Sequence, residues 1–353
     1  MTTEALLEVR NLRAYIGTPR GNVRAVDDVT FALGRGESLG VVGESGSGKS
    51  VMAKALMGLM PPRSGRSGEV IFDGRDLLSL SKKDKLEIWG NQISMVFQDP
   101  GRSLNPVVRV ERQLTEGMRK HLGMNRSDAH SRALQLLEEV GVPDPERRLR
   151  NYPHEMSGGM RQRVMIAIAL ACEPELLIAD EPTTALDVTV QRQILDLLRR
   201  IQRDRGTSIM LISHDLAVVA GQTDRVAVMY AGRLAEMGST REVFDSPSHR
   251  YTYALLGATP RIDHPRHTPL RLIDGALPDP VSPPDGCRYG PRCEVAVAAC
   301  STPGPIFESV GPDHAVACVV PVGAPVSTGG PVSVNPVAPV GAAASSGGSH
   351  HGR

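Results

Sequence analysis

The stretch Gly43-Glu44-Ser45-Gly46-Ser47-Gly48-Lys49-Ser50 organises this chain and decides its fold. It fits the pattern G-x-x-x-x-G-K-[ST] and lies between an apolar strand-like run (38–42) and a run with few helix breakers (51–60). The glycines let successive N–H groups turn inward around phosphate oxygens, and the following helix adds its positive N-terminal end. Lys49 is expected to reach the β- and γ-phosphates, and the Ser50 hydroxyl to bind Mg²⁺. The stretch therefore predicts that the chain binds a nucleoside triphosphate.

The composition limits the class of protein. The 353 residues suffice for one large domain with an appendage or for two domains. Hydrophobic residues make up 41% of the chain and aromatic residues only 3%, so the core must be aliphatic. Forty basic residues balance 39 acidic ones, which argues against a nucleic-acid surface as the main function.

The expected location is the cytosol. The N-terminus has no basic region followed by an apolar one, and no window approaches 18 consecutive apolar residues, so we expect neither a secretory signal nor a membrane span. In that location the five cysteines are more consistent with thiols or metal ligands than with disulfides.

Hydrophobic patterns predict an α/β sheet domain with a helical insertion. Residues 100–156 change to helical periodicity, with Ser127 as the expected cap of a helix that ends at Gly141. A second helix, with its apolar stripe from Val190 to Ile201, is expected to end at Gly206. Strands are expected over 6–42, 68–74 (ending in an Asp-Gly turn), 93–97, 176–179 and 208–212, followed by a hairpin over 225–236 that turns at Ala231-Gly232.

The composition changes after about residue 258. Prolines punctuate an irregular segment that holds four of the five cysteines, and Pro, Val, Gly, Ala and Ser dominate from Val319 onward. We expect a small irregular element over 259–320 and a disordered tail over 321–353.

Two further segments carry chemistry. The apolar strand 176–179 ends in Asp180-Glu181, which places one carboxylate beside the phosphate loop for Mg²⁺ and the next to polarise an attacking water. Ser157-Gly158-Gly159 begins a predicted helix and forms a second N-terminus suited to anions. A chain that binds one nucleotide has no obvious need for two such termini.

These motifs, together with Gln98, Ala185-Leu186-Asp187 and His214, occur in an order that resembles the ATP-binding cassette (ABC) family. The resemblance implies a P-loop NTPase cassette over 5–258, with an N-terminal antiparallel β subdomain and a helical subdomain over about 100–160. It also implies a head-to-tail dimer in which each ATP lies between one subunit's phosphate loop and the other's signature segment, 157–162. The second anion-suited helix then serves the partner's nucleotide.

The family assigns a role to each matching residue. Glu181 is implied as the general base, and His214 as the contact to the γ-phosphate. Gln98 is implied to sense Mg²⁺ and the attacking water and to couple to the membrane subunits, and Asp187 to bridge the dimer. The implied Mg²⁺ ligands are Ser50, Gln98 and Asp180. The implied ATP contacts are Gly43, Glu44, Ser45, Gly46, Ser47, Gly48, Lys49, Ser50 and Val51, with Ser157, Gly158, Gly159 and Gln162 facing the partner's ATP.

The adenine contact departs from the family pattern. The family places an aromatic residue near the N-terminus to stack on adenine, and that position aligns with Ile16, next to Tyr15. Either Tyr15 takes over the contact or stacking is weakened.

The C-terminal part resembles the oligopeptide/dipeptide importer branch of the family, as do residues 97–106 and 238–252. In that branch four cysteines can hold a [4Fe–4S] cluster, here Cys287, Cys293, Cys300 and Cys318. The ligand type suits an iron–sulfur cluster or zinc, the lack of a C-x₂-C pair disfavours a zinc ribbon, and plain thiols are the third alternative. Cys172, in an apolar helical run, is expected to be a small buried hydrophobe.

The resemblance implies an ATPase subunit that powers import of di- or oligopeptides from the cytoplasmic face of the membrane. The implied partners are a second cassette (a copy or a paralogue), two permease subunits and an extracytoplasmic peptide-binding protein. Another solute such as nickel stays open. Cassette ATPases of DNA repair or of ribosomes are disfavoured, because only about sixty residues without sustained heptads separate Gln98 from Ser157 and because the chain carries one cassette. Intact catalytic motifs disfavour a scaffold without activity.

Overall fold

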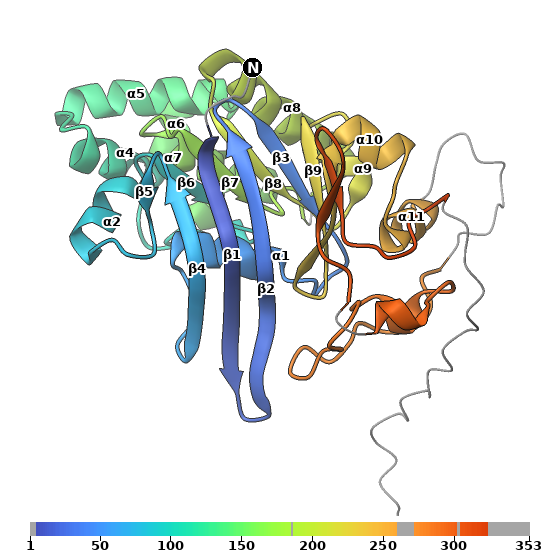
Figure 1. Cartoon of the computed structure of the whole chain (residues 1–353). Coiled ribbons are helices and arrows are strands. Elements are labelled where there is room, and N and C mark those ends of the chain that lie inside the picture. Colours follow the sequence, from blue (N-terminus) through green and yellow to red (C-terminus); the bar gives the residue numbers. More distant parts are fainter. Residues whose placement is uncertain (1–4, 185, 260–271, 302–303, 324–353) are drawn as a thin grey trace, which may run out of the picture.

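The computed structural model describes residues 5–184, 186–259, 272–301 and 304–323. These residues form two sheets with helices around them (Figure 1). A four-stranded antiparallel sheet lies against an eight-stranded sheet, and the C-terminal extension lies at the opposite end of the larger sheet from helices α4 to α6. This is the expected α/β cassette architecture with an antiparallel subdomain and an extension.

The antiparallel sheet has the strand order β2-β1-β4-β5. A long hairpin of β1 (Ala5–Thr18) and β2 (Gly21–Gly34) pairs through β1 with β4 (Ser64–Phe72). The short strand β5 (Arg75–Asp76) follows the expected turn at Asp73-Gly74. Several register shifts interrupt the β1–β2 pairing, and one of them lies between Ala14 and Tyr15.

The larger sheet has the order β11-β12-β10-β9-β3-β8-β7-β6. The five consecutive strands from β9 to the edge strand β6 are parallel, and every residue of β3, β7 and β8 is buried, as expected for a sheet covered on both faces. Parallel strands present their carboxyl ends at one edge, so the segments after β3, β6, β7 and β8 meet there. The parallel strands are β3 (Ser38–Val42), β6 (Ile93–Val96), β7 (Leu176–Asp180), β8 (Ser208–Ile212) and β9 (Arg225–Tyr230), with β10 (Arg233–Ser239) antiparallel beside β9.

The helices follow the predicted regions, with corrections at two ends. Helix α1 ends at Met57, where Gly58 takes a left-handed conformation. Helix α5 is capped by Asn125, whose side chain accepts a hydrogen bond from Asp128 N, and not by the expected Ser127. The helices are α1 (Lys49–Met57), α2 (Lys82–Ile88), α3 (Pro100–Ser103), α4 (Val110–His121), α5 (Arg126–Glu139), α6 (Pro145–Arg150), α7 (Gly158–Leu170), α8 (Val188–Arg205), α9 (Leu216–Val219), α10 (Thr240–Asp245) and α11 (Arg250–Gly257).

Three apolar clusters hold these layers together. The first joins the antiparallel sheet and α1 to one face of the larger sheet, and the second joins α4, α5, α7 and α8 to the other face. The third is smaller, and three tyrosines form its centre: Tyr230, Tyr251 and Tyr289, with ring centroids 4.5–5.4 Å apart. Tyr289 belongs to the extension, so this cluster docks the extension on the cassette.

The extension contains two strands that the sequence did not predict. β12 (His314–Val316) pairs with β10 and so extends the larger sheet, and β11 (Glu308–Gly311) pairs with β12. At this junction the fully buried carboxylate of Glu236 binds His314 Nε2 at 2.7 Å and the backbone N–H groups of Ser248 and His249. Most of the predicted tail, from residue 324 on, lies outside the described residues, as does Ala185.

Within the described ranges, no helix is long and apolar enough to cross a membrane.

Candidate nucleotide-binding site

The phosphate loop joins the buried strand β3 to α1, as predicted. Gly43 and Gly48 have φ angles of 150° and 104°, which favour glycine. A Cβ atom on Gly43 would collide with the Met229 carbonyl oxygen, and one on Gly48 with the Ala25 carbonyl oxygen. Both positions therefore require glycine for two reasons: the positive φ angle, and the lack of room for a Cβ atom.

The loop holds the Lys49 side chain, which is almost fully buried. Its Nζ donates to the carbonyl oxygens of Gly43 at 2.7 Å and Glu44 at 2.9 Å, and lies 3.4 Å from Ser47 Oγ. Burial lowers the pKa of Lys49, while the carboxylates of Glu181, Asp180 and Glu44 oppose that shift. Three residues of the loop itself, Gly43, Glu44 and Ser47, thus hold the ammonium group of Lys49 in place.

Ser50 and Asp180 form the next part of the site. Ser50 Oγ donates to Asp180 Oδ1 at 2.7 Å, which joins the start of α1 to the end of β7. Burial raises the pKa of Asp180, against the Ser50 hydrogen bond and the positive charges of Lys54 and Lys49. A hydroxyl and a carboxylate oxygen at one point are the donors that Mg²⁺ prefers, so these residues fit the expected ion.

Glu181 lies at the centre of a polar cluster. Gln98 Nε2 donates to Glu181 Oε2 at 2.8 Å and Thr184 Oγ1 donates to the same oxygen at 2.9 Å, while His214 Nδ1 lies 3.4 Å from Oε1. Glu181 has a φ of 48°, a left-handed conformation that is uncommon for a side chain of this size. Such strain, held by neighbouring contacts, is found preferentially at functional sites. Glu181 therefore contacts both of the other residues predicted to be catalytic, Gln98 and His214.

A cavity of about 620 Å³ opens over the loop, within the range of ligand-binding pockets. Ile16 lines it, whereas Tyr15 is 44% exposed and its ring lies where a Cβ on Gly65 would be. The structure thus places Ile16 beside the loop, and does not place Tyr15 there. The predicted residues that line the cavity are Ser45, Gly46, Gly48, Lys49, Ser50, Val51, Gln98 and Glu181.

The signature segment lies outside this cavity. Ser157 caps α7, with its Oγ accepting from Met160 N, and Ser157 and Gly158 are exposed. Gln162 is buried, and its Nε2 has no hydrogen-bond partner in the described part of the chain. Asp187 caps α8 through a 2.9 Å hydrogen bond from Val190 N. Among the lining residues just described, none comes from 157–162.

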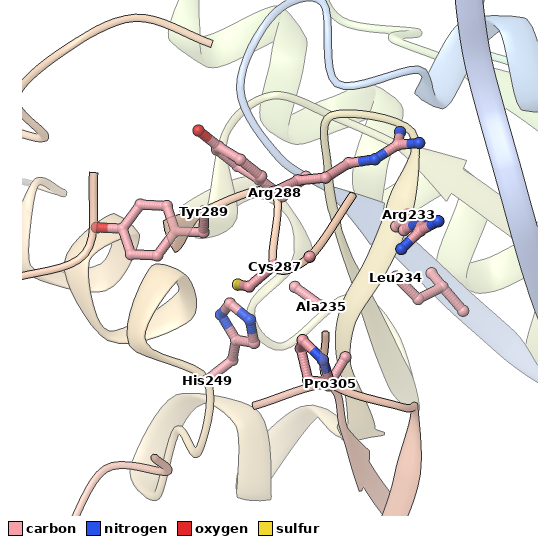
Figure 2. Close-up of a pocket in the computed structure, with 11 residues that line it drawn as sticks. Arg233, Leu234, Ala235, His249, Cys287, Arg288, Tyr289 and Pro305 are labelled. Carbon is pink, nitrogen blue, oxygen red and sulfur yellow. The ribbon is translucent and has the colours of Figure 1, made fainter. Parts of the chain in front are cut away.

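Three of the predicted cluster cysteines influence one another. Burial is the main cause that raises the pKa of Cys287 to about 11, and the nearby Cys300 and Cys318 add to this shift. Figure 2 shows Cys287 beside the His249 ring, with Arg288 and Tyr289 extending in opposite directions. In the described ranges, which include all four thiols, no group of three or more His, Cys, Asp or Glu residues could hold a metal ion. Burial raises the pKa of the free Cys287, Cys293 and Cys318 thiols and so favours their neutral form, and binding of iron would have to release their protons.

The sequence prediction missed the contacts between the extension and the phosphate loop. Arg292 forms a two-point ion pair with Glu44, at 2.8 and 3.2 Å, and Tyr251 Oη accepts from Glu44 N at 2.9 Å. Burial is the largest single influence on the pKa of Arg292 and lowers it, but the hydrogen bonds and charges of Glu44 and Tyr230 together outweigh burial and raise that pKa. Arg288 binds Asp27 and the Ala231 carbonyl oxygen. The local signal in the sequence is a pair of arginines, Arg288 and Arg292, each next to a cysteine.

The fold and this site together define an ATP-binding cassette. The model of the ABC transporter family matches residues 26–184, and that of the oligopeptide/dipeptide transporter C-terminal region matches residues 235–300. A solved dimeric cassette bound to ADP and phosphate, 26% identical, superimposes with a TM-score of 0.61 over 67% of this chain and 99% of its own.

Similar proteins of known name indicate the branch of the family to which the chain belongs. The chain is 49% identical over 319 residues to the oligopeptide transport ATP-binding protein OppD of Escherichia coli, covering 90% of this chain and 94% of that protein. It is also 49% identical to the dipeptide transport ATP-binding protein DppD of Bacillus subtilis, over 89% and 94% of the two chains. The chain belongs to the family of oligopeptide/dipeptide ABC transporter ATP-binding proteins.

Proposed function

We propose that this chain hydrolyses ATP to power import of di- or oligopeptides. The observation that carries the proposal is the convergence of Lys49, Ser50, Asp180, Glu181 and Gln98 at one cavity. Lys49 neutralises charge on the β- and γ-phosphates, as do the N–H groups at the start of α1. Bound Mg²⁺, held by Ser50 and Asp180 with Gln98 nearby, supplies further charge neutralisation.

Glu181 is the proposed general base. Its carboxylate accepts hydrogen bonds from Gln98 and Thr184, which fix its orientation toward an attacking water. His214 is the proposed contact to the γ-phosphate, and its Nδ1 lies 3.4 Å from Glu181 Oε1, which supports a position at the same site. The reaction is mainly one of positioning and electrostatic stabilisation, as is typical of phosphoryl transfer.

A second cassette is proposed to complete the site. The exposed Ser157 and Gly158 at the start of α7 offer N–H groups to an anion, but they lie outside the chain's own cavity. In a head-to-tail dimer they face the partner's γ-phosphate, and Asp187 lies at the contact. ATP binding then closes the dimer, and hydrolysis followed by product release reopens it.

The printed names of the relatives support peptides as the transported substrate. The proposed partners are two membrane permeases and an extracytoplasmic peptide-binding protein, with this chain on the cytoplasmic face of the membrane. Affinity purification of the full chain from solubilised membranes is expected to recover permeases and any second cassette. Recovery of ribosomes or DNA in their place would contradict the proposal, and nickel uptake without peptide uptake would change the substrate.

The catalytic assignment is tested with Glu181→Gln. This variant is expected to bind MgATP and to lower ATP turnover by about 10²–10⁴-fold, the usual effect of losing a general base. The exposed Glu116→Gln is the matched control and should hydrolyse ATP like the unmodified chain. Near-normal hydrolysis by Glu181→Gln would exclude Glu181 as the base.

A [4Fe–4S] cluster on the cysteines stays a prediction from the family resemblance, and no step of the mechanism above uses it. Iron content and visible absorbance of anaerobically purified protein measure it directly, with zinc content determined on the same sample.

A further inference from the structure

A short piece of the extension lines the nucleotide cavity. Residues 277–280, Leu277-Pro278-Asp279-Pro280, border the same cavity as the phosphate loop, and we call them the strap. A Cβ built on Gly46 would lie 3.4 Å from Leu277 Cδ1, which places Leu277 over the loop. The strap therefore contributes to the site from a part of the chain far from the cassette motifs.

The two ends of the cavity differ in chemistry. Lys49, Ser50, Gln98 and Glu181 mark the end that takes the triphosphate. A nucleoside attached to that triphosphate must occupy the remaining space. The other residues that line the cavity include Ile16, Arg20, Val23, Arg24 and the strap.

The nucleoside end is largely aliphatic. Ile16 and Val23 come from the β1–β2 hairpin, and Leu277 and Pro278 come from the strap; all four are half-buried. Ile16 stands where stacking by an aromatic ring was expected, and Tyr15 lies over Gly65. Apolar side chains remove the faces of a purine ring from water without a stacking partner. We propose that Leu277 and Pro278 form, with Ile16 and Val23, an aliphatic clamp for the adenosine part of ATP.

Two contacts fix the strap against the hairpin. Arg24 N donates to the Pro280 carbonyl oxygen at 2.8 Å, and Asp279 pairs with Arg20 at 2.8 Å. Leu277 also packs against the third apolar cluster, the one centred on the three tyrosines. These contacts within the chain hold the strap beside the hairpin. This inference rests on the proposed function, because it assumes that ATP is the ligand.

Leu277→Ala in the full chain tests the clamp by calorimetric titration with MgATP, MgADP and Mg-tripolyphosphate, which has no nucleoside. Shortening the half-buried Leu277 side chain removes its proposed contact with adenosine. ATP and ADP binding are expected to weaken about five- to tenfold, and tripolyphosphate binding to stay unchanged. Leu272→Ala, on an exposed leucine of the same extension, should change none of the three affinities. An equal loss for all three ligands, or no loss for ATP, would overturn the clamp.

Ile16→Phe tests the clamp in the opposite direction, because this variant is expected to bind ATP more tightly. Damage to the fold would weaken binding and could not produce that result. A ring at this position should stack on the base and tighten ATP and ADP about tenfold, again without effect on tripolyphosphate. Unchanged or weaker ATP binding by this variant would place the nucleoside elsewhere. Equal affinities of the unmodified chain for tripolyphosphate and ATP would contradict the clamp but not the phosphate site. Binding of neither ligand would contradict the proposed function itself.

Discussion

Replacing Arg292 with alanine removes the guanidinium group that joins the extension to the phosphate loop. The Arg292 side chain is only 6% exposed, and it donates to Glu44, to Tyr230 Oη and to the carbonyl oxygens of Ile273 and Asp274. Glu44 is 24% exposed, so its carboxylate would lose its partner while staying partly screened from water. An unpaired negative charge would then lie beside the loop that receives a triphosphate.

The size of the effect follows from Coulomb's law. Two unit charges about 10 Å apart, at an effective dielectric constant of about 20, interact with about 1.7 kcal/mol. An energy of about 1.4 kcal/mol is a tenfold change in affinity. We therefore expect Arg292→Ala to raise the Kd for MgATP about tenfold, in addition to destabilising the fold by about 2–3 kcal/mol through the lost hydrogen bonds.

A double-mutant cycle separates charge from structure. If the unpaired carboxylate is the cause, adding Glu44→Gln to Arg292→Ala should restore most of the MgATP affinity in calorimetric titration. Arg241→Ala, on a 90% exposed arginine, is the control and should have no effect on binding. Equal affinities for Arg292→Ala and the double variant would refute the charge argument and leave loss of the docked extension as the cause.

Two further predictions concern stability, measured by chemical denaturation. Gly48→Ala should cost more than about 2 kcal/mol, because φ is 104° and the Ala25 carbonyl oxygen fills the space, whereas Gly74→Ala, which has open space at φ 73°, should cost about 1 kcal/mol. Equal costs would contradict the steric argument. Burial lowers the pKa of His249 to about 4 from 6.5, so the unfolded chain takes up the proton first as the pH falls. The contribution of neutral His249 to the free energy of unfolding should therefore be fully present above pH 6.5. It should decrease between pH 6.5 and 4, by at most about 1.4 kcal/mol per pH unit. His249→Gln should flatten this slope relative to the exposed control His154→Gln; parallel slopes would exclude His249 as the cause.

Local patterns explain why much of the site was predictable. The strand, loop and helix around Lys49 are contiguous, and parallel strands bring Gln98, Glu181 and His214 to the same edge once each strand end is recognised. Gln98 directly follows an apolar run, and Glu181 and His214 lie two positions after one, which is a signal that sequence alone carries.

The contacts that escaped prediction depend on distance along the chain and on register. Arg292 and Glu44 are 248 positions apart, so no periodicity relates them. The choice between Tyr15 and Ile16 depends on which face of β1 each occupies, and the register shifts around Ala14 make a count by alternation unreliable. Ser127 was a reasonable cap, but Asn125 precedes it and competes for the same role.

The pairing of β12 with β10 sets an order of events during synthesis. The larger sheet ends at β10 until residues 314–316 arrive, and until then the Glu236 carboxylate has no His314 to bind. Leu277 and Arg292, which reach the nucleotide cavity and its loop, also emerge late. A growing chain that has finished every cassette motif by His214 thus still has an open sheet edge and an unfinished ligand pocket. Nucleotide can therefore stabilise this protein to its full extent only near the end of translation, and a cassette cut after residue 258 would expose β10 to pairing with other chains.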